Sequence, residues 1–288
     1  MGCILLNRFL KTQNYKSLSD LSNFTNLKLK NMTLLPDKQL LSRICQTAGK
    51  KIMAIYNDRD LFQNVSIKSD NSPLTLADKA SHEIIEHELR QNYPDIPIIS
   101  EEGKDTPFDI RKNYSVFWLV DPLDGTKEFI NRNDEFTVNI ALIIDQYPVA
   151  GFIYAPVTDV LYIAVNGVAS KVEKGQETIL KVRQNSGNRI AVGSRSHASE
   201  EEKLVLKAYN VTETISRGSS FKFCMIAEGM ADIYYRHGPT MEWDTAAGQA
   251  ILEAAGGHVF KENKTKERFS YNKETLLNSG FLCLGFNP

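Results

Sequence analysis

The chain has 288 residues, of which 42% are hydrophobic and 24% charged, as expected for a globular protein with one large domain or two packed ones. Its formal net charge of −1 excludes a general electrostatic attraction to nucleic acid or anionic membranes, and nothing indicates an obligate protein partner. The four cysteines are far apart and show no CxxC spacing, so they indicate neither a zinc site nor a disulfide framework and favour a reducing cytoplasm: Cys3, Cys45, Cys224 and Cys283.

Residues 1–33 match no structured pattern. The apolar patch Cys3–Leu6 is too short for a signal-peptide core, and no run reaches the roughly 20 apolar residues of a membrane-spanning helix. A basic composition, with Asp20 as the only acidic residue, leaves a weak organelle-targeting interpretation open. We predict a disordered extension, or a start codon assigned too early with Met32 as the real beginning.

Regular structure begins after Pro36. Asp37 is a suitable N-cap for a helix that runs to about Tyr56 with apolar residues at helical spacing. A short strand is expected at Val65–Lys68, and a second amphipathic helix at Leu76–Asn92.

Two predicted strands, Ile96–Ser100 and Phe117–Val120, each run directly into acidic residues. Between them, Gly103–Tyr114 is expected to be a mobile polar loop. The second strand leads into a turn that contains two aspartates, and Gly125-Thr126 then opens a short helix, Lys127–Ile130.

The remaining elements change character along the chain. Short β segments first suggest an antiparallel meander: Phe136–Ile144, Val149–Tyr154, Val160–Val165 and Ala169–Val172. Strands then alternate with helices, which indicates an α/β region: Ile190–Gly193, Glu200–Tyr209, Val211–Ile215, Ser219–Gly229, Ala231–Tyr235 and Trp243–Ala255. We therefore predict an α+β part at 34–186 and an α/β part at 187–288, with a soft boundary near residues 183–188.

Acidic residues lie where several of these elements start or stop: Asp78, Glu101, Glu102, Asp121, Asp124 and Asp244. Such positions can converge on a cleft, and two carboxylates held together need a cation to offset their repulsion. Oxygen ligands without paired His or Cys favour Mg²⁺ over zinc. The amides at Gly125-Thr126 could seat a phosphate at a helix N-terminus.

Each observation alone has a simpler explanation. Asp78 and Asp244 could be helix caps, and Glu101-Glu102 a solvated loop pair. The segment DPLDGT at 121–126 could be a tight turn in which proline presets the backbone.

The motifs taken together resemble a known family. DPLDGT at 121–126 with WDTAAGQAILEAAGG at 243–257 is similar to the inositol monophosphatase superfamily of Mg²⁺-dependent, lithium-sensitive phosphatases. The flanking motifs resemble its 3′(2′),5′-bisphosphate nucleotidase branch: KSDNSPLTLAD (68–78), SEEG (100–103), DGTKEFI (124–130), GSRSH (193–197), GSSFKFCMIAEG (218–229) and GPTMEWDTAAG (238–248). The resemblance extends from about Leu34 to the C-terminus and implies a layered αβαβα sandwich.

The resemblance also implies roles for individual residues. Glu101, Asp121 and the carbonyl of Leu123 would hold one Mg²⁺, and Asp121, Asp124 and Asp244 a second, with two or three ions in the site. The catalytic residues would be Asp78, Thr126 and Glu101. Asp78, through Thr126 or a further ion, would help to deprotonate the attacking water, and no covalent phosphoenzyme is expected. The substrate-binding positions would be Glu101, Gly125, Thr126, Lys127, Glu128, Ser194, His197, Gly218, Lys222, Arg236 and Asp244.

Lys222 and Arg236 are the expected contacts of a second phosphate, although each could also be an ordinary surface charge. Trp243 is expected to be a packing residue that fixes Asp244 rather than a stacking platform. Haloacid-dehalogenase chemistry is excluded, because Pro122 stands where its paired aspartate would be.

The expected activity is Mg²⁺-dependent hydrolysis of adenosine 3′,5′-bisphosphate to AMP and phosphate, which would clear a by-product of sulfate assimilation. 3′-Phosphoadenylyl sulfate is a second expected substrate, and lithium and calcium are expected inhibitors. Two alternatives stay open, an inositol phosphate phosphatase with the same metal residues and a catalytically silent nucleotide sensor. The expected location is the cytoplasm, with attachment to the inner membrane suggested only by analogy with relatives.

Overall fold

A computed structural model describes residues 36–62, 65–67, 73–184, 187–193, 200–262 and 267–288. Residues 36–288 form one compact unit by their contacts. The extension predicted at 1–33 lies outside the described residues, and the division at 186/187 stays a prediction.

A seven-stranded sheet forms the centre of the unit. Its strands follow one another in space in chain order: β3 (Ile98–Ser100), β4 (Val116–Asp124), β5 (Thr137–Ile144), β6 (Tyr147–Ala155), β7 (Val160–Val165), β8 (Val168–Glu173) and β9 (Gln176–Ile179). β3 is parallel to β4, and every later pair is antiparallel. The predicted meander is therefore confirmed, and β9, which was not predicted, extends it.

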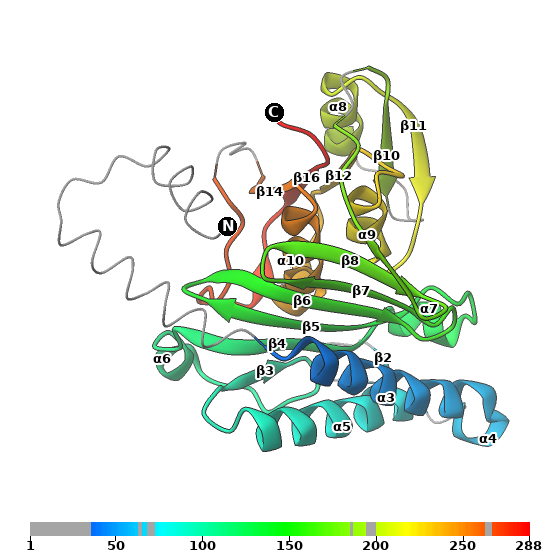
Figure 1. The fold of residues 1–288 in the computed structure, drawn as a ribbon, viewed down its shortest axis with the longest axis vertical. Coiled ribbons are helices and arrows are strands. Elements are labelled where there is room, and N and C mark those ends of the chain that lie inside the picture. Colours follow the sequence, from blue (N-terminus) through cyan, green and yellow to red (C-terminus); the bar gives the residue numbers. More distant parts are fainter. Residues whose placement is uncertain (1–35, 63–64, 68–72, 185–186, 194–199, 263–266) are drawn as a thin grey trace. The chain divides into compact units, whose positions relative to one another are not determined.

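Two long helices cover one face of this sheet, as Figure 1 shows. α3 (Lys38–Asn57) begins where Asp37 Oδ1 accepts the amides of Gln39 and Leu40 at 2.8 and 3.1 Å, and α5 is Leu76–Asn92. Their apolar faces pack on alternate residues of β4, including Trp118 and Val120. Both helices confirm the sequence prediction.

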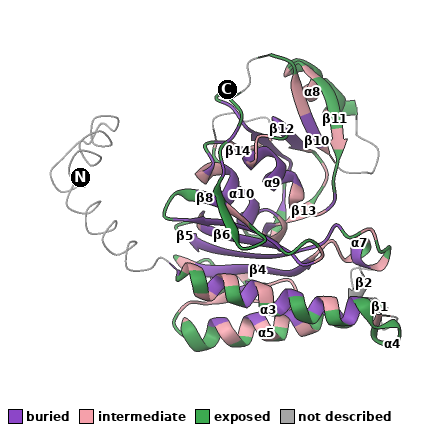
Figure 2. Cartoon of the chain, turned by 45° about the vertical axis from the view of Figure 1, so that its right-hand side comes forward, coloured by how far each residue is buried: buried purple, intermediate pink, exposed green. Residues whose placement is uncertain are grey.

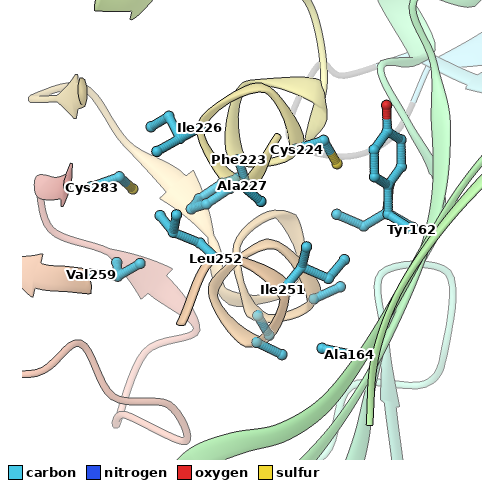
Figure 3. Packing of buried hydrophobic residues seen from close by; sticks show 14 of the residues in the cluster. Tyr162, Ala164, Phe223, Cys224, Ile226, Ala227, Ile251, Leu252, Val259 and Cys283 are labelled. Carbon is cyan, nitrogen blue, oxygen red and sulfur yellow. The ribbon is translucent and has the colours of Figure 1, made fainter. Parts of the chain in front are cut away.

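The opposite face of the sheet packs on α9 (Phe221–Ala227) and α10 (Ala246–Ala254). Phe223 of α9 and Leu252 of α10 lie within one apolar cluster (Figure 3). The approach is close, because a Cβ at Gly151 of β6 would lie 2.5 Å from the carbonyl oxygen of Ala247. Both helices are mostly buried in Figure 2, as expected for an inner layer.

A second sheet and an outer helix complete the layers. The sheet order is β11 (Val211–Ser216), β10 (Arg189–Gly193), β12 (Ile233–Arg236), β16 (Phe281–Leu284) and β14 (His258–Lys261). Its outer face packs on α8 (Glu200–Ala208) through Val205 and Leu206. The layers are thus helix, sheet, helix, sheet and helix, which confirms the predicted αβαβα sandwich.

Short elements connect the layers. They are α4 (Arg59–Phe62), α6 (Phe108–Arg111), α7 (Thr126–Ile130), the 3₁₀ helix η1 (Glu242–Asp244) and the two-stranded pairs β1 (Val65–Ile67) with β2 (Pro73–Thr75) and β13 (Thr240–Met241) with β15 (Leu277–Asn278).

Three local predictions were wrong. Asp121 and Asp124 belong to β4 rather than to a following turn, because the strand continues through an irregularity between them. The predicted loop at 103–114 contains α6, whose buried Arg111 donates to the carbonyl of Glu274 at 2.7 Å. The helix predicted from Trp243 is divided into η1 and α10.

Two expectations from composition can be compared with the described residues. Cys45, Cys224 and Cys283 are fully buried free thiols, and burial raises the pKa of each one. Cys3 lies outside the described ranges. Among the helices that the structure describes, none has both the length and the apolar composition needed to cross a bilayer.

Candidate active site

Acidic residues from three elements meet at the end of β4. Glu101 follows β3, which is parallel to β4, and the Glu101 amide donates to the carbonyl of Val120 at 3.1 Å. Asp121, the residue after Val120, therefore lies beside Glu101, and Asp244 is contributed by η1. Burial and then the carboxylates of Glu101, Asp124 and Asp244 raise the pKa of Asp121 well above its ordinary value. Four carboxylates thus share one electrostatic environment.

The irregular end of β4 determines the direction of these side chains. The amide of Leu123 donates to Asp121 Oδ1 at 3.1 Å, and the carbonyl of Pro122 accepts from the Ser81 hydroxyl at 2.7 Å. In a regular strand, residues three apart point to opposite faces of the sheet. The register of β4 shifts between Asp121 and Asp124, so this alternation is interrupted between the two aspartates.

Asp124 is fixed through one of its two oxygens. Asp124 Oδ2 accepts from the hydroxyls of Ser219 and Ser220 at 2.6 and 2.7 Å and from Asn139 Nδ2 at 3.2 Å. Three donors on one oxygen limit rotation of the carboxylate.

Asp244 lies at the end of η1, directly before α10. Its Oδ2 accepts from the Met241 amide at 2.8 Å, so it caps η1, and its carbonyl oxygen accepts from Ser220 at 3.0 Å. Burial and then the charge of Asp124 raise the pKa of Asp244, while the Met241 amide acts in the opposite direction. The capping explanation and the site explanation therefore hold for the same residue.

Asp78 likewise has two contacts. Its Oδ2 accepts the Thr75 amide at 2.7 Å and completes a capping box at the start of α5, whereas Oδ1 accepts from the Thr126 hydroxyl at 3.1 Å. Burial raises the pKa of Asp78, and the hydrogen bonds from Thr75 oppose this. The charge of Glu102 adds to the rise.

Gly125 forms the bend that leads from β4 into α7. Its φ of 94° is in the left-handed region, and a Cβ there would lie 3.0 Å from the carbonyl oxygen of Glu135. Glycine is therefore needed for the chain to turn here. Lys127 is exposed on α7, and Glu128 lies close to Gly218, where an added Cβ would meet Glu128 Cγ at 3.0 Å.

A polar pocket adjoins the acidic cluster. It has an empty volume of about 510 Å³, and its walls include Asp124, Asp244, Lys222 and Arg236. Lys222 is buried, and its Nζ donates to the carbonyl of Ser219 at 2.6 Å. Burial lowers the pKa of Lys222, while Asp124 acts to raise it. The pocket thus places two cationic side chains beside two of the carboxylates.

The chemistry of the donor set fits Mg²⁺, whose usual ligands are carboxylate and carbonyl oxygens. Within the described ranges, however, no three His, Cys, Asp or Glu side chains are already arranged to hold a metal ion. The carboxylates lie close together, but Asp124 Oδ2 already accepts a hydrogen bond from Ser219 and Asp244 Oδ2 accepts one from the Met241 amide. The two observations are compatible because Mg²⁺ retains several waters and needs few protein ligands.

The structure brings together most of the residues predicted for the site and leaves some outside. Ser194 and His197 lie outside the described residues. Gly218 is buried against α7, where its amide donates to Glu135 Oε2 at 2.7 Å. Trp243 is partly buried and packs against the central apolar cluster, as predicted.

Several polar residues that the sequence motifs did not indicate support the site. They are Glu135, Thr137, Asn139, Ser219 and Ser220. One signal was available, because polar residues alternate with apolar ones at 135–140 although the strand that follows is otherwise apolar.

Comparison with known proteins gives the same family as the motifs. Residues 36–283 match the model of the inositol monophosphatase family. The chain is 48% identical over 246 residues to the 3′(2′),5′-bisphosphate nucleotidase CysQ of Shigella flexneri, and 47% identical to that of Escherichia coli K12. Each alignment covers 84% of this chain and 98% of the relative.

Solved structures agree. The crystal structure of CysQ from Bacteroides thetaiotaomicron, described as a bacterial member of the inositol monophosphatase family, superposes with a TM-score of 0.76 at 41% identity. It covers 87% of this chain and 98% of that one. An inositol monophosphatase from Anabaena, at 21% identity and a TM-score of 0.63, shares the fold.

Proposed function

The chain belongs to the inositol monophosphatase family, and on this basis we propose that it hydrolyses the 3′-phosphate of adenosine 3′,5′-bisphosphate, releasing AMP and phosphate. The observation that carries this proposal is that an acidic cluster and a pocket with cationic side chains adjoin each other in one site. An acidic cluster suited to Mg²⁺ adjoins a pocket with Lys222 and Arg236, which could bind the phosphate that is not cleaved. The relatives named as bisphosphate nucleotidases support the same substrate class.

The residues that would hold metal follow from this proposal. Glu101, Asp121 and the carbonyl of Leu123 would bind one Mg²⁺, and Asp121, Asp124 and Asp244 a second. When bound, such ions supply charge that stabilises the phosphoryl oxygens in the transition state. Metal dependence is a family property, whereas the identity and number of the ions are part of our proposal.

Thr126 and Asp78 would direct the proton of the attacking water. Thr126 Oγ1 donates to Asp78 Oδ1, so the lone pairs of the threonine oxygen are available to accept a hydrogen bond from the water. As the water oxygen forms its bond to phosphorus, Thr126 takes a proton from the water and passes its own proton to Asp78, while the bond from phosphorus to the 3′-oxygen breaks. The 3′-oxygen takes a proton from solvent water and leaves as the hydroxyl of AMP, and phosphate is the second product.

The pocket would determine the choice of substrate. Lys222 of α9 and Arg236 of β12 line the same pocket as Asp124 and Asp244. An inositol monophosphate has no second phosphate for these two cationic side chains to bind. 3′-Phosphoadenylyl sulfate keeps an anionic group at the 5′ side and is a second proposed substrate. A cytoplasmic location stays a prediction.

A phosphate-release screen tests the proposal. Adenosine 3′,5′-bisphosphate, 3′-AMP, 5′-AMP and inositol 1-phosphate are compared with Mg²⁺, with Mg²⁺ plus Li⁺, and with EDTA. We expect the highest kcat/KM for the 3′,5′-bisphosphate, and loss of activity with EDTA that Mg²⁺ restores. A higher kcat/KM for inositol 1-phosphate would contradict the substrate assignment. Phosphate release that Asp121→Asn leaves unchanged would contradict the assignment of the site.

A further inference from the structure

Ser220 occupies the N-cap position of α9 but does not cap the helix. A serine at this position normally accepts an amide of the first helical turn. Here no side-chain capping bond is formed, and the hydroxyl lies 2.7 Å from Asp124 Oδ2 and 3.0 Å from the carbonyl oxygen of Asp244. The hydroxyl is therefore used to join two residues that are 120 positions apart in the chain (from residue 124 to residue 244).

Asn139 orients this hydroxyl. Its Nδ2 donates to Ser220 Oγ at 2.9 Å and to Asp124 Oδ2 at 3.2 Å, and an amide nitrogen has two protons for these two bonds. Its Oδ1 accepts from the Thr137 hydroxyl at 2.9 Å, which fixes the direction of the amide group. With Asn139 donating to it, the single proton of Ser220 is directed to Asp124 and Asp244.

β5 and the residues directly before it hold the loop before α9. Thr137 and Asn139 of β5 are spaced by two, so they lie on one side of the strand, and Glu135 precedes the strand by two residues. Glu135 accepts from Arg217 Nη1 at 2.8 Å and from the Gly218 amide at 2.7 Å, and Thr137 lies 2.7 Å from the Ser219 hydroxyl. Buried polar groups that hydrogen-bond to one another in this way favour one arrangement of the loop.

We propose that Ser220, oriented by Asn139, is a positioning residue that holds Asp124 and Asp244 in the relative placement needed to bind Mg²⁺. The inference rests on the proposed function, because it takes both carboxylates as metal ligands. Partners that hydrogen-bond to metal ligands typically change metal affinity by roughly 10- to 100-fold when they are removed.

Calorimetric titration with Mg²⁺ in the absence of substrate tests this inference. We expect Ser220→Ala to bind Mg²⁺ at least about 10-fold more weakly than the unmodified protein. Ser170→Ala is the matched control, because Ser170 and Ser220 are both 2% exposed, and Ser170 lies in β8, which three strands separate from β4 and where it contacts Glu177. We expect this control to keep the original Mg²⁺ affinity.

Ser220→Ala with unchanged Mg²⁺ affinity would overturn the inference and leave the proposed function standing. Absence of Mg²⁺ binding in the unmodified protein would overturn both. If Ser220→Ala shows no cooperative thermal unfolding, Asn139→Ala takes its place, since it leaves the Ser220 hydroxyl without its orienting donor. Mg²⁺ affinity in Asn139→Ala equal to that of Ser170→Ala would then overturn the inference.

Discussion

The hydroxyl of Thr126 lies 3.1 Å from Asp78 Oδ1, while the other oxygen of the same carboxylate caps α5. One aspartate thus fixes the start of a helix and faces the proposed position of the attacking water. The cap holds the carboxylate in place, because rotation away from Thr126 would also break the bonds to Thr75.

Removal of the Thr126 hydroxyl is expected to slow the reaction rather than weaken substrate binding. General-base assistance contributes roughly 100- to 10,000-fold, so Thr126→Val should lower kcat within that range. Thr126→Ser keeps the hydroxyl and should retain most of kcat. Steady-state phosphate release with adenosine 3′,5′-bisphosphate measures both, and equal kcat for the valine and serine variants would contradict the assigned role.

Replacement of Lys222 by methionine is expected to reduce the preference for a bisphosphate. A hydrogen bond to a charged group is worth about 1.5–3 kcal/mol, which corresponds to a loss of roughly 10- to 100-fold in kcat/KM. The loss should be much smaller for 3′-AMP, which lacks the second phosphate. Lys112→Met is the control, because Lys112 is an exposed lysine that forms an ion pair with Asp109. A proportional loss for both substrates would show that Lys222 does not recognise the second phosphate.

The ion pair between buried Glu242 and partly buried Lys273 is expected to be important for stability. Glu242 is fully buried, and its Oε1 lies 2.6 Å from Lys273 Nζ. Loss of the lysine leaves the carboxylate, among the described residues, with only the amides of residues 272 and 273 as donors, so Lys273→Met should lower the free energy of unfolding by about 1–3 kcal/mol. Asp109→Asn, in an exposed pair with Lys112, should change it by only about 0–1 kcal/mol. Urea denaturation compares the two, and similar changes would contradict the prediction.

His237 is expected to titrate above the ordinary histidine pKa of about 6.5. The hydrogen bond and charge of Glu262 raise the pKa of His237, with smaller effects from Glu201 and Glu202. Because the folded pKa is raised, the stabilisation is fully present below the unfolded pKa and is lost as the pH rises through the folded value. NMR titration of the imidazole measures the midpoint. Glu262→Gln should lower it, and an unchanged midpoint would exclude Glu262 as the cause.

The sequence predicted the fold where periodicity is strong and local. The helices around Ile44 and Ile85 and the apolar strands of the meander were found because each buries a regular face. β9 was missed because its four residues, Gln176–Ile179, are all exposed and carry no apolar pattern. The aspartates of DPLDGT were placed in a turn because proline and glycine chemistry outweighed the continuing ladder between β4 and β5.

The candidate metal ligands could be predicted from the sequence, whereas the residues that hydrogen-bond to them could not. Asp121 and Asp124 follow an apolar strand, which is a local signal in the chain. Ser220 contacts Asn139 and Asp124, which are 81 and 96 positions away, and no local pattern indicates partners at such distances. Only packing of α9 against the sheet brings these residues together.

The full burial of Cys45, Cys224 and Cys283 provides an internal reporter of conformation. Only a thiolate reacts readily with an alkylating reagent, and the raised thiol pKa values suppress the thiolate in the folded chain. Modification of these thiols therefore requires the surrounding layers to open. In a variant in which Cys3 is replaced by serine, the rate of alkylation would report how often the sandwich opens, without any added label.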